Sequence, residues 1–192
     1  MVAPGRRGRT LALVSLGFAV FGGPGLLAGL VPWVISRWRF RQPFFGFGPL
    51  RAVGVVLVAL GLAVLGESII RFVRVGRGTL VPAVPTEQLV VGGLYRYLRN
   101  PMYVAVTTMI VGEGLLFGDA GMLVYAAVVA VGFHLFVRGY EEPTLRRTYG
   151  AEFDRYCGAV RRWLPHLRAA QAPFGKGAQE SPSSARVHSR PR

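Results

Sequence analysis

Long apolar runs separated by arginine-rich segments dominate this sequence. The clearest run extends from Leu50 to about Phe72 and contains no proline. A helix needs about 20 consecutive, mostly apolar residues to cross the hydrocarbon core of a bilayer, and this run is that long. It therefore predicts a transmembrane helix and an integral membrane protein.

Three further apolar runs predict three more spans, giving an all-α fold of about four transmembrane helices. The first covers residues 11–34 and is interrupted at Gly22–Gly25, which predicts a kink or a broken helix there. The third and fourth cover residues 102–117 and 122–137. Because only Gly118–Gly121 separates their helical patterns, we expect an antiparallel helical hairpin.

The net charge of +14 lies beside these runs rather than on one soluble face. Arginines in that position hold helix ends against anionic headgroups, so we expect a membrane as partner and no nucleic acid. Basic residues are more numerous on the side that carries both termini, which predicts a multi-pass cell-membrane protein with cytoplasmic termini. One cysteine and three scattered histidines predict neither a disulfide nor a metal site.

The chain changes character after Arg138. Over residues 143–164 apolar residues recur at intervals of three and four, which predicts an amphipathic surface helix, or two short ones broken at Gly150. Apolar residues become scarce later, so we expect a disordered basic tail over residues 170–192. The membrane domain would then cover residues 1–169.

Paired acids follow the fourth predicted span. Carboxylates are unfavourable at a helix C-terminus, so something cationic should offset Glu141 and Glu142. Arg138, four residues before Glu142, is one possibility, and a cationic ligand is another. Pro143 is expected to end the span here and to turn the carboxylates back toward the helix mouth.

Other polar residues have simpler explanations. Asn100 and Pro101 suit the N-cap and first turn of a helix. Ionisable groups inside a bilayer are candidates for function, but Glu67 lies near the end of its span and would reach the interface. Glu113 lies deeper and would be protonated and hydrogen-bonded, while His134 would be a hydrogen-bonded core residue.

The stretches around Asn100 and Glu141 resemble a known family. Arg99-Asn100-Pro101-x-Tyr103, then Glu141-Glu142-x-x-Leu145-x-x-x-Tyr149-Gly150-x-x-Phe153-x-x-Tyr156, is similar to the isoprenylcysteine carboxyl methyltransferases, and phospholipid N-methyltransferases share this core. The resemblance covers residues 89–165. Each motif alone is weak, and the two in this order around a tight hairpin are more specific.

The resemblance implies a site for S-adenosylmethionine on the cytoplasmic side, between the last membrane helices and the surface helix. By position, its residues would be Gln88, Leu89, Val90, Tyr95, Arg99, Asn100, Pro101, Tyr103, Glu141 and Glu142. Arg138, on the substrate side, and Glu142 would serve catalysis. Carboxylates and aromatic faces suit the cofactor's ammonium and sulfonium, and Arg99 or Asn100 would donate to its carboxylate.

Two positions depart from the family pattern. The family usually has histidine where this chain has Asn100, and glycine where it has Ala105. Asparagine keeps the hydrogen bonding but cannot transfer a proton near neutral pH, so we expect no mechanism that needs a base there. Ala105 would tighten close helix packing.

The leading hypothesis is methyl transfer from S-adenosylmethionine to a lipidic or membrane-embedded acceptor, either a carboxylate or an amine. The absence of an evident base favours a nucleophile that is already ionised. One alternative is a membrane sterol-type reductase that uses NADPH, although Met102 and Val104–Val106 do not fit its pattern. The other is a non-enzymatic membrane scaffold or transporter subunit, suggested by the interrupted first span and by Glu113.

Overall fold

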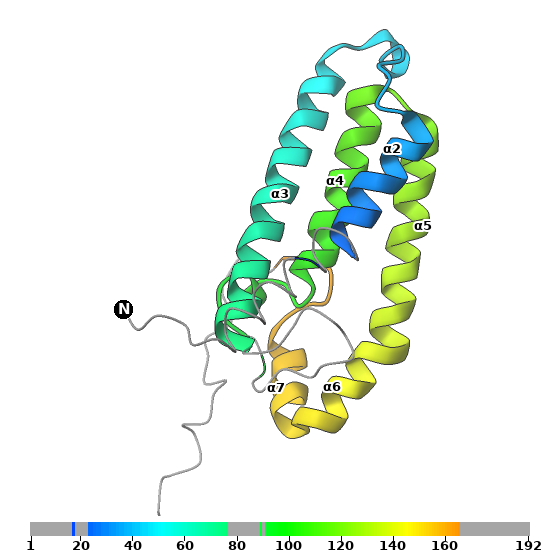
Figure 1. Ribbon diagram of the computed structural model, residues 1–192. Coiled ribbons are helices and arrows are strands. Elements are labelled where there is room, and N and C mark those ends of the chain that lie inside the picture. The colour runs from blue at the N-terminus through cyan, green and yellow to red at the C-terminus, as the bar shows by residue number, and fades with distance from the viewer. Residues whose placement is uncertain (1–16, 18–22, 77–88, 90, 166–192) are drawn as a thin grey trace, which may run out of the picture.

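The computed structural model describes residues 17, 23–76, 89 and 91–165, and side chains are described for all of these except residues 72–76. All regular elements within these residues are helical, which confirms the all-α prediction. They are η2 (Leu26–Leu30), α2 (Val31–Ser36), η3 (Phe44–Gly46), α3 (Pro49–Gly76), η4 (Gly93–Arg96), α4 (Pro101–Phe117), α5 (Ala120–Phe136), η5 (Val137–Glu141), α6 (Glu142–Tyr149) and α7 (Ala151–Ala159). Helices α2 to α5 lie side by side, and α6 and α7 close one end (Figure 1).

Two apolar helices are long enough, by length and composition, to cross a membrane. They are Pro49–Arg71, within α3, and Ala120–Tyr149, which joins α5, η5 and α6. The helices Leu26–Ser36 and Pro101–Phe117 are apolar but shorter. The predicted second and fourth spans thus appear as long apolar helices, and the predicted third span as a shorter one.

Small residues let α3 and α4 approach closely. A Cβ atom added to Gly54 would lie 2.6 Å from the carbonyl oxygen of Gly112, and one added to Gly112 would lie 2.8 Å from that of Gly54. Two turns further along α3, a Cβ atom added to Gly61 would lie 2.9 Å from the carbonyl oxygen of Ala105. Backbones this close leave no room for side chains, as in small-residue helix interfaces of membrane proteins. The backbone of Ala105 is therefore part of this close packing, and the effect of its methyl group stays a prediction.

The turn between α4 and α5 makes the predicted antiparallel hairpin. Gly118 ends α4 with a φ of +70°, and Asp119 caps α5 by accepting a hydrogen bond from the backbone N–H of Gly121 at 2.9 Å. The α2–α3 connector closes over this turn. The N–H of Arg41 donates to the carbonyl of Phe117, and the Arg41 guanidinium lies 3.3 Å from the buried Asp119 carboxylate.

The prediction that Pro143 ends the fourth span is wrong. The helix continues from α5 through the π-helical turn η5 into α6, and Glu142 keeps a helical φ of −62°. Proline lacks the N–H that an α-helix needs and crowds the carbonyl four residues earlier. In the π turn the N–H of Glu142 instead reaches the carbonyl of Val137, five residues back, so the register shifts before the proline. Pro32 follows η2 in the same way, and there Val31 N–H bonds to Leu26 O.

The C-terminal region forms two short helices, α6 and α7, rather than one. They meet at Gly150, whose φ of +53° is unfavourable for other residues, as the sequence pattern allowed. Phe153 and Tyr156 of α7 and Val160 after it form a small core, each at most 3 % exposed, and Leu145 and Tyr149 of α6 pack against it. After α7 the chain becomes extended at Val160 and returns toward the start of α4.

Several predictions concern residues that lie outside the described part. The structure does not describe residues 11–16 and 18–22, most of residues 77–90, or any of residues 166–192. The length of the first span, its interruption before Gly23, the path of the long connector and the disorder of the tail therefore stay predictions.

Candidate functional site

Both polar stretches singled out in the sequence meet at the end of the bundle that carries α6 and α7 (Figure 1). α4 begins at this end and α5 finishes there. The hydroxyl of Tyr103 donates a hydrogen bond to Glu141 Oε2 at 2.8 Å. Arg99 Nη1 lies 3.1 Å from Glu142 Oε1. The start of the third predicted span and the paired acids are thus in direct contact.

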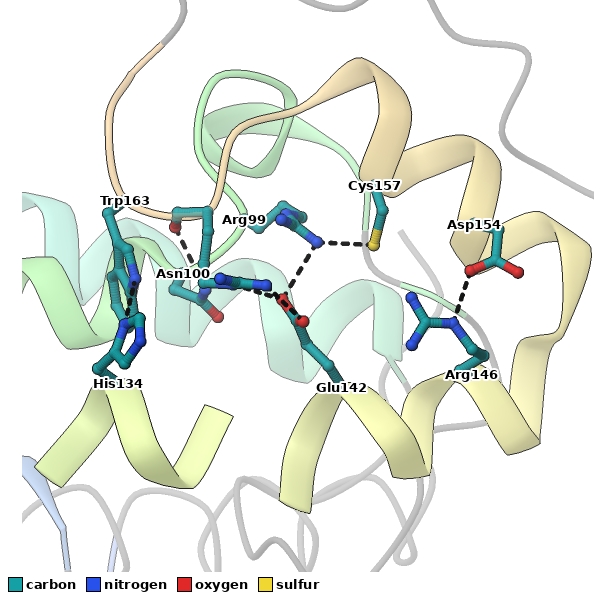
Figure 2. Close-up of polar contacts among 9 residues, drawn as sticks. Arg99, Asn100, His134, Glu142, Arg146, Asp154, Cys157 and Trp163 are labelled. Carbon is teal, nitrogen blue, oxygen red and sulfur yellow. Dashed lines mark hydrogen bonds and ion pairs between the residues drawn. The ribbon is translucent and has the colours of Figure 1, made fainter. Parts of the chain in front are cut away.

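Glu142 is held between two arginines (Figure 2). Arg162 reaches both carboxylate oxygens, with Nε and Nη2 each at 2.7 Å, and Arg99 approaches the same group from the other side. Such a two-pronged pairing fixes the orientation of the carboxylate and adds charge-assisted hydrogen bonds. The hydrogen bond to Glu142 also raises the pKa of Arg162 above its usual value. Glu142 is therefore a buried, fully paired carboxylate.

The cation that offsets Glu142 is not Arg138. The side chain of Arg138 is exposed on η5, and no ion pair within the described residues joins it to Glu142. Glu142 instead turns inward, toward the start of α4 and the returning C-terminal chain.

Residues 160–163, which we call the C-terminal strap, run across the start of α4. The N–H of Arg99 donates to the carbonyl of Arg161 at 3.0 Å. The indole N–H of Trp163 donates to His134 Nδ1 at 3.2 Å, so His134 is hydrogen-bonded as predicted (Figure 2). The strap thereby ties α7 to both α4 and α5.

Asn100 takes part in this strap contact instead of capping α4. It stands at the N-cap position and Pro101 begins the helix, as predicted, but the Asn100 side chain makes no capping hydrogen bond. Its Nδ2 donates to the carbonyl of Arg162 at 3.2 Å, and the residue is 8 % exposed. The side chain is drawn away from the helix end because the strap carbonyl lies within its reach.

Glu141 and two tyrosines form the second half of the site. The Tyr103 ring packs against Phe133, with centroids 4.5 Å apart, while its hydroxyl binds Glu141. Tyr95 is buried in η4, and its carbonyl accepts a hydrogen bond from the Tyr156 hydroxyl at 2.7 Å. Burial first, and then the negative charge of neighbours including Glu141, raise the pKa of Tyr95, so its hydroxyl stays protonated near neutral pH. This half of the site offers one carboxylate and aromatic faces.

Cys157 lies beside the arginine pair. Its sulfur accepts a contact from Arg99 Nη1 (Figure 2). Burial raises the pKa of the Cys157 thiol, and the positive charge of Arg99 only partly opposes this. The thiol is therefore neutral near pH 7 and acts as a small half-buried group.

The two carboxylates within the predicted spans behave differently. Glu67 forms an ion pair with Arg71, one turn later in α3, with Oε1 2.7 Å from Nε. Glu113 is 8 % exposed, and its Oε2 has no hydrogen-bond partner among the described residues. The prediction of a hydrogen-bonded Glu113 is therefore not supported.

The remaining predicted site residues differ in their burial, and two of them are not described by the structure. Leu89 packs against the core beneath α7, Pro101 is fully buried, and Arg138 is exposed. Gln88 and Val90 lie outside the described residues.

Sequence reasoning missed Arg162. In the amphipathic pattern it is one of many arginines on a polar face, and nothing in its spacing connects it with Glu142, twenty residues earlier. Only the fold of α7 and the strap brings the two together. The one indication in the sequence was that Glu142, at the end of an apolar helix, needs a cationic partner.

The comparison with known families covers much of the same region of the chain. A family model described as phospholipid methyltransferase matches residues 50–152, more than half of the chain. The match extends from α3 through the hairpin to the beginning of α7, and ends before Cys157 and the strap. The comparison with curated proteins found no match.

Proposed function

The chain belongs to the phospholipid methyltransferase family, and on that premise we propose that it transfers a methyl group from S-adenosylmethionine to a lipidic or membrane-embedded acceptor. The observation that carries the proposal is the joining of Tyr103 to Glu141, and of Arg99 to Glu142, at one end of an apolar bundle. These are the motifs on which the resemblance to membrane methyltransferases depends.

The placement in the bilayer is part of the proposal. Large aliphatic side chains stand exposed along α3 and α5, including Val55, Leu60, Val128 and Leu135. Lipid would cover them, since apolar surface of this extent is rare on soluble monomers. The apolar segment containing α2, together with α3, α4 and α5, would form four spans, with both termini cytoplasmic. α6 and α7 would then lie at the membrane surface, with the site at that level.

The described residues suit the cofactor. Its positive sulfonium and ammonium groups match the Glu141 carboxylate and the rings of Tyr95 and Tyr103. Asn100 and Pro101 would form the wall at the start of α4, and Gln88, Leu89 and Val90 would complete the pocket from the connector. When bound, S-adenosylmethionine supplies an electrophilic methyl group.

Glu142 would serve this site by holding its walls. Both of its oxygens already accept hydrogen bonds from guanidinium groups, so it fixes Arg99 and the strap against α4. Glu141, which has one tyrosine partner, would be the carboxylate that faces the cofactor's positive charge.

The residues of the site would act mainly by positioning and by excluding water. Orientation of two bound reactants can supply several kcal/mol of catalysis, on the order of 7–11 at best. Position 100 is asparagine rather than the family's usual histidine, so it cannot take a proton from the acceptor. An acceptor that is already ionised, such as a carboxylate, therefore fits better than a protonated amine. Exposed Arg138, just beyond the apolar part of α5, would pair with an acidic group of the acceptor.

The test is cofactor binding and methyl transfer by the full-length protein in lipid nanodiscs. Wild-type protein should bind S-adenosylmethionine in calorimetry and transfer a labelled methyl group to extracted membrane lipids. Glu141→Gln should weaken binding about tenfold, the order expected for one charge-assisted hydrogen bond. Glu152→Gln removes the same charge from α7, away from the site, and should change nothing. Wild-type binding at background level would overturn the proposal.

A further inference from the structure

The α3 side of the site carries an ion pair that the family motifs do not include. Arg71 Nε donates to Glu67 Oε1 at 2.7 Å, and both side chains are about one third exposed (34 % and 35 %). Arg71 also marks the end of the apolar stretch Pro49–Arg71. Arginine at such a boundary lies at the depth of lipid headgroups.

The guanidinium of Arg71 lies against the backbone of two glycines. A Cβ atom on Gly92 would stand 3.0 Å from Arg71 Nη1, and one on Gly93 would overlap the guanidinium group itself. Gly93 also has a φ of +57°, which disfavours any side chain. The paired glycines thus leave the space in which Arg71 reaches the segment leading into α4.

Arg71 is also close to the proposed reaction site. Gly93, against which the Arg71 guanidinium lies, begins η4, and η4 also contains the buried Tyr95. The charges of Glu141, Glu67 and Arg71 all act on the Tyr95 hydroxyl.

The arginines of the Glu142 cluster have less to offer a ligand. Arg162 donates to Glu142 through both Nε and Nη2, and Arg99 pairs with the same carboxylate through Nη1. Arg146 has only Nε in an ion pair, as Arg71 does, but its partner is Asp154 and its guanidinium lies over the Phe153 ring. In Arg71 only Nε is used by an ion pair, so both terminal nitrogens keep donors for an oxyanion within the part of the chain that the structure describes. A guanidinium fork suits carboxylate and phosphate groups.

We propose that Arg71 binds an anionic group of a ligand in the methyl-transfer site, while Glu67 orients its guanidinium and tempers its charge. The inference rests on the proposed function. The anion is a carboxylate or a phosphate: the carboxylate of the methyl donor, or the phosphate of a lipid headgroup. Both have the charge and planar or tetrahedral oxygens that arginine recognises.

Two matched ligand pairs separate these sources. S-adenosylmethionine and its decarboxylated analogue differ in the carboxylate, and dihexanoyl phosphatidate and dihexanoylglycerol differ in the phosphate. Binding of each is measured by calorimetry with the full-length protein in phosphatidylcholine nanodiscs. Arg71→Gln should weaken binding of the carboxylate- or phosphate-bearing member of one pair about tenfold, and should leave binding of the member that lacks this group unchanged. Arg147→Gln, which removes an exposed charge from α6, is the matched control.

Glu67→Gln distinguishes ligand binding from a purely structural brace. Glutamine keeps an acceptor for Arg71 Nε but removes the negative charge, so binding of the same anion should become about threefold tighter. If the Glu67–Arg71 pair only stabilised the structure, Glu67→Gln would leave the binding of both ligands of a pair unchanged or would weaken it. This variant also decides the matter should Arg71→Gln fail to fold.

The outcomes separate the two proposals. If Arg71→Gln weakens the binding of both members of each ligand pair equally, or weakens the binding of neither, the proposed role of Arg71 is overturned. The methyl-transfer proposal still stands in that case, provided that the wild-type protein binds S-adenosylmethionine. Absence of that binding in wild-type protein overturns the methyl-transfer proposal, and the phosphate pair still tests Arg71.

Discussion

At the scale of single residues, the site depends on how one buried carboxylate is satisfied. Glu142 accepts three guanidinium contacts, and two of them come from the strap residue Arg162. Removing one partner of a buried ion pair leaves the other charge poorly solvated, which costs more than the pair itself contributes. The strap is therefore held by the same interaction that satisfies the acid.

Arg162→Ala should destabilise the protein and weaken cofactor binding together. Since the Arg162 side chain is 27 % exposed, we expect a loss of about 1–3 kcal/mol, at the lower end for a buried pair. Thermal unfolding in detergent and calorimetry with S-adenosylmethionine measure the two effects. Arg162→Lys should recover part of the stability, because one charged contact remains.

A matched control is Arg155→Ala on α7, whose guanidinium is exposed and, among the residues that the structure describes, donates to the carbonyl of Ala151 alone. It should change the unfolding temperature little. Equal effects of the two alanine variants would contradict the role assigned to the Arg162–Glu142 pair.

The sequence predicted where residues lie along a helix better than it predicted which side chains they contact. Pro101 and the N-cap place of Asn100 follow from local backbone chemistry, and both are where the sequence puts them. The partners of Asn100 and Glu142 lie some 62 and 20 residues later in the chain. Such contacts depend on how α7 and the strap fold back, and local patterns contain no information on that.

At the scale of elements, the α3–α4 interface depends on the absence of side chains. Gly54 and Gly112 face each other so closely that each would place a Cβ atom within 3 Å of the other's carbonyl oxygen. Lipid tails supply no hydrophobic driving force between helices, so close backbone packing contributes much of their association. The interface should therefore tolerate no added methyl group.

Gly112→Ala should destabilise the bundle by about 1–3 kcal/mol, because overpacking forces the two backbones apart. Gly66→Ala in α3 is the control, since nothing lies within 4 Å of its added Cβ. That change should be neutral or stabilising by about 0.5–1 kcal/mol, because alanine is the better helix former. Thermal unfolding of both variants in the same detergent measures the difference, and similar losses would refute the packing argument.

The same scale explains why the helix boundary at Pro143 was predicted wrongly. Apolar periodicity and the hairpin turn gave α4 and α5 correctly, because both signals are local. A π turn has no comparable sequence signature, yet one precedes Pro143 and another precedes Pro32. Each adds a residue to the helical turn, so the proline is accommodated and the helix does not end.

At the scale of the whole molecule, the two ends of the bundle differ in what they expose. The α2–α3 connector lies at one end, with Phe45 fully exposed and Trp38 and Phe47 more than half exposed. α6, α7 and the site lie at the other end (Figure 1). Aromatic residues beside arginines suit a membrane–water interface. If the bundle spans the membrane, these two ends must face opposite sides.

Cysteine labelling tests this arrangement. Phe45→Cys and Ala151→Cys each place a thiol at an exposed position, one at either end. With cytoplasmic termini, a membrane-impermeant maleimide should label Phe45→Cys from outside intact cells, and should label Ala151→Cys only in inside-out vesicles. The wild-type protein supplies the background, which should be low: burial raises the pKa of the Cys157 thiol, so little reactive thiolate forms at pH 7. Labelling of both variants from the same side would mean that the bundle does not cross the bilayer, and the methyl-transfer site would then need another route to a lipid acceptor.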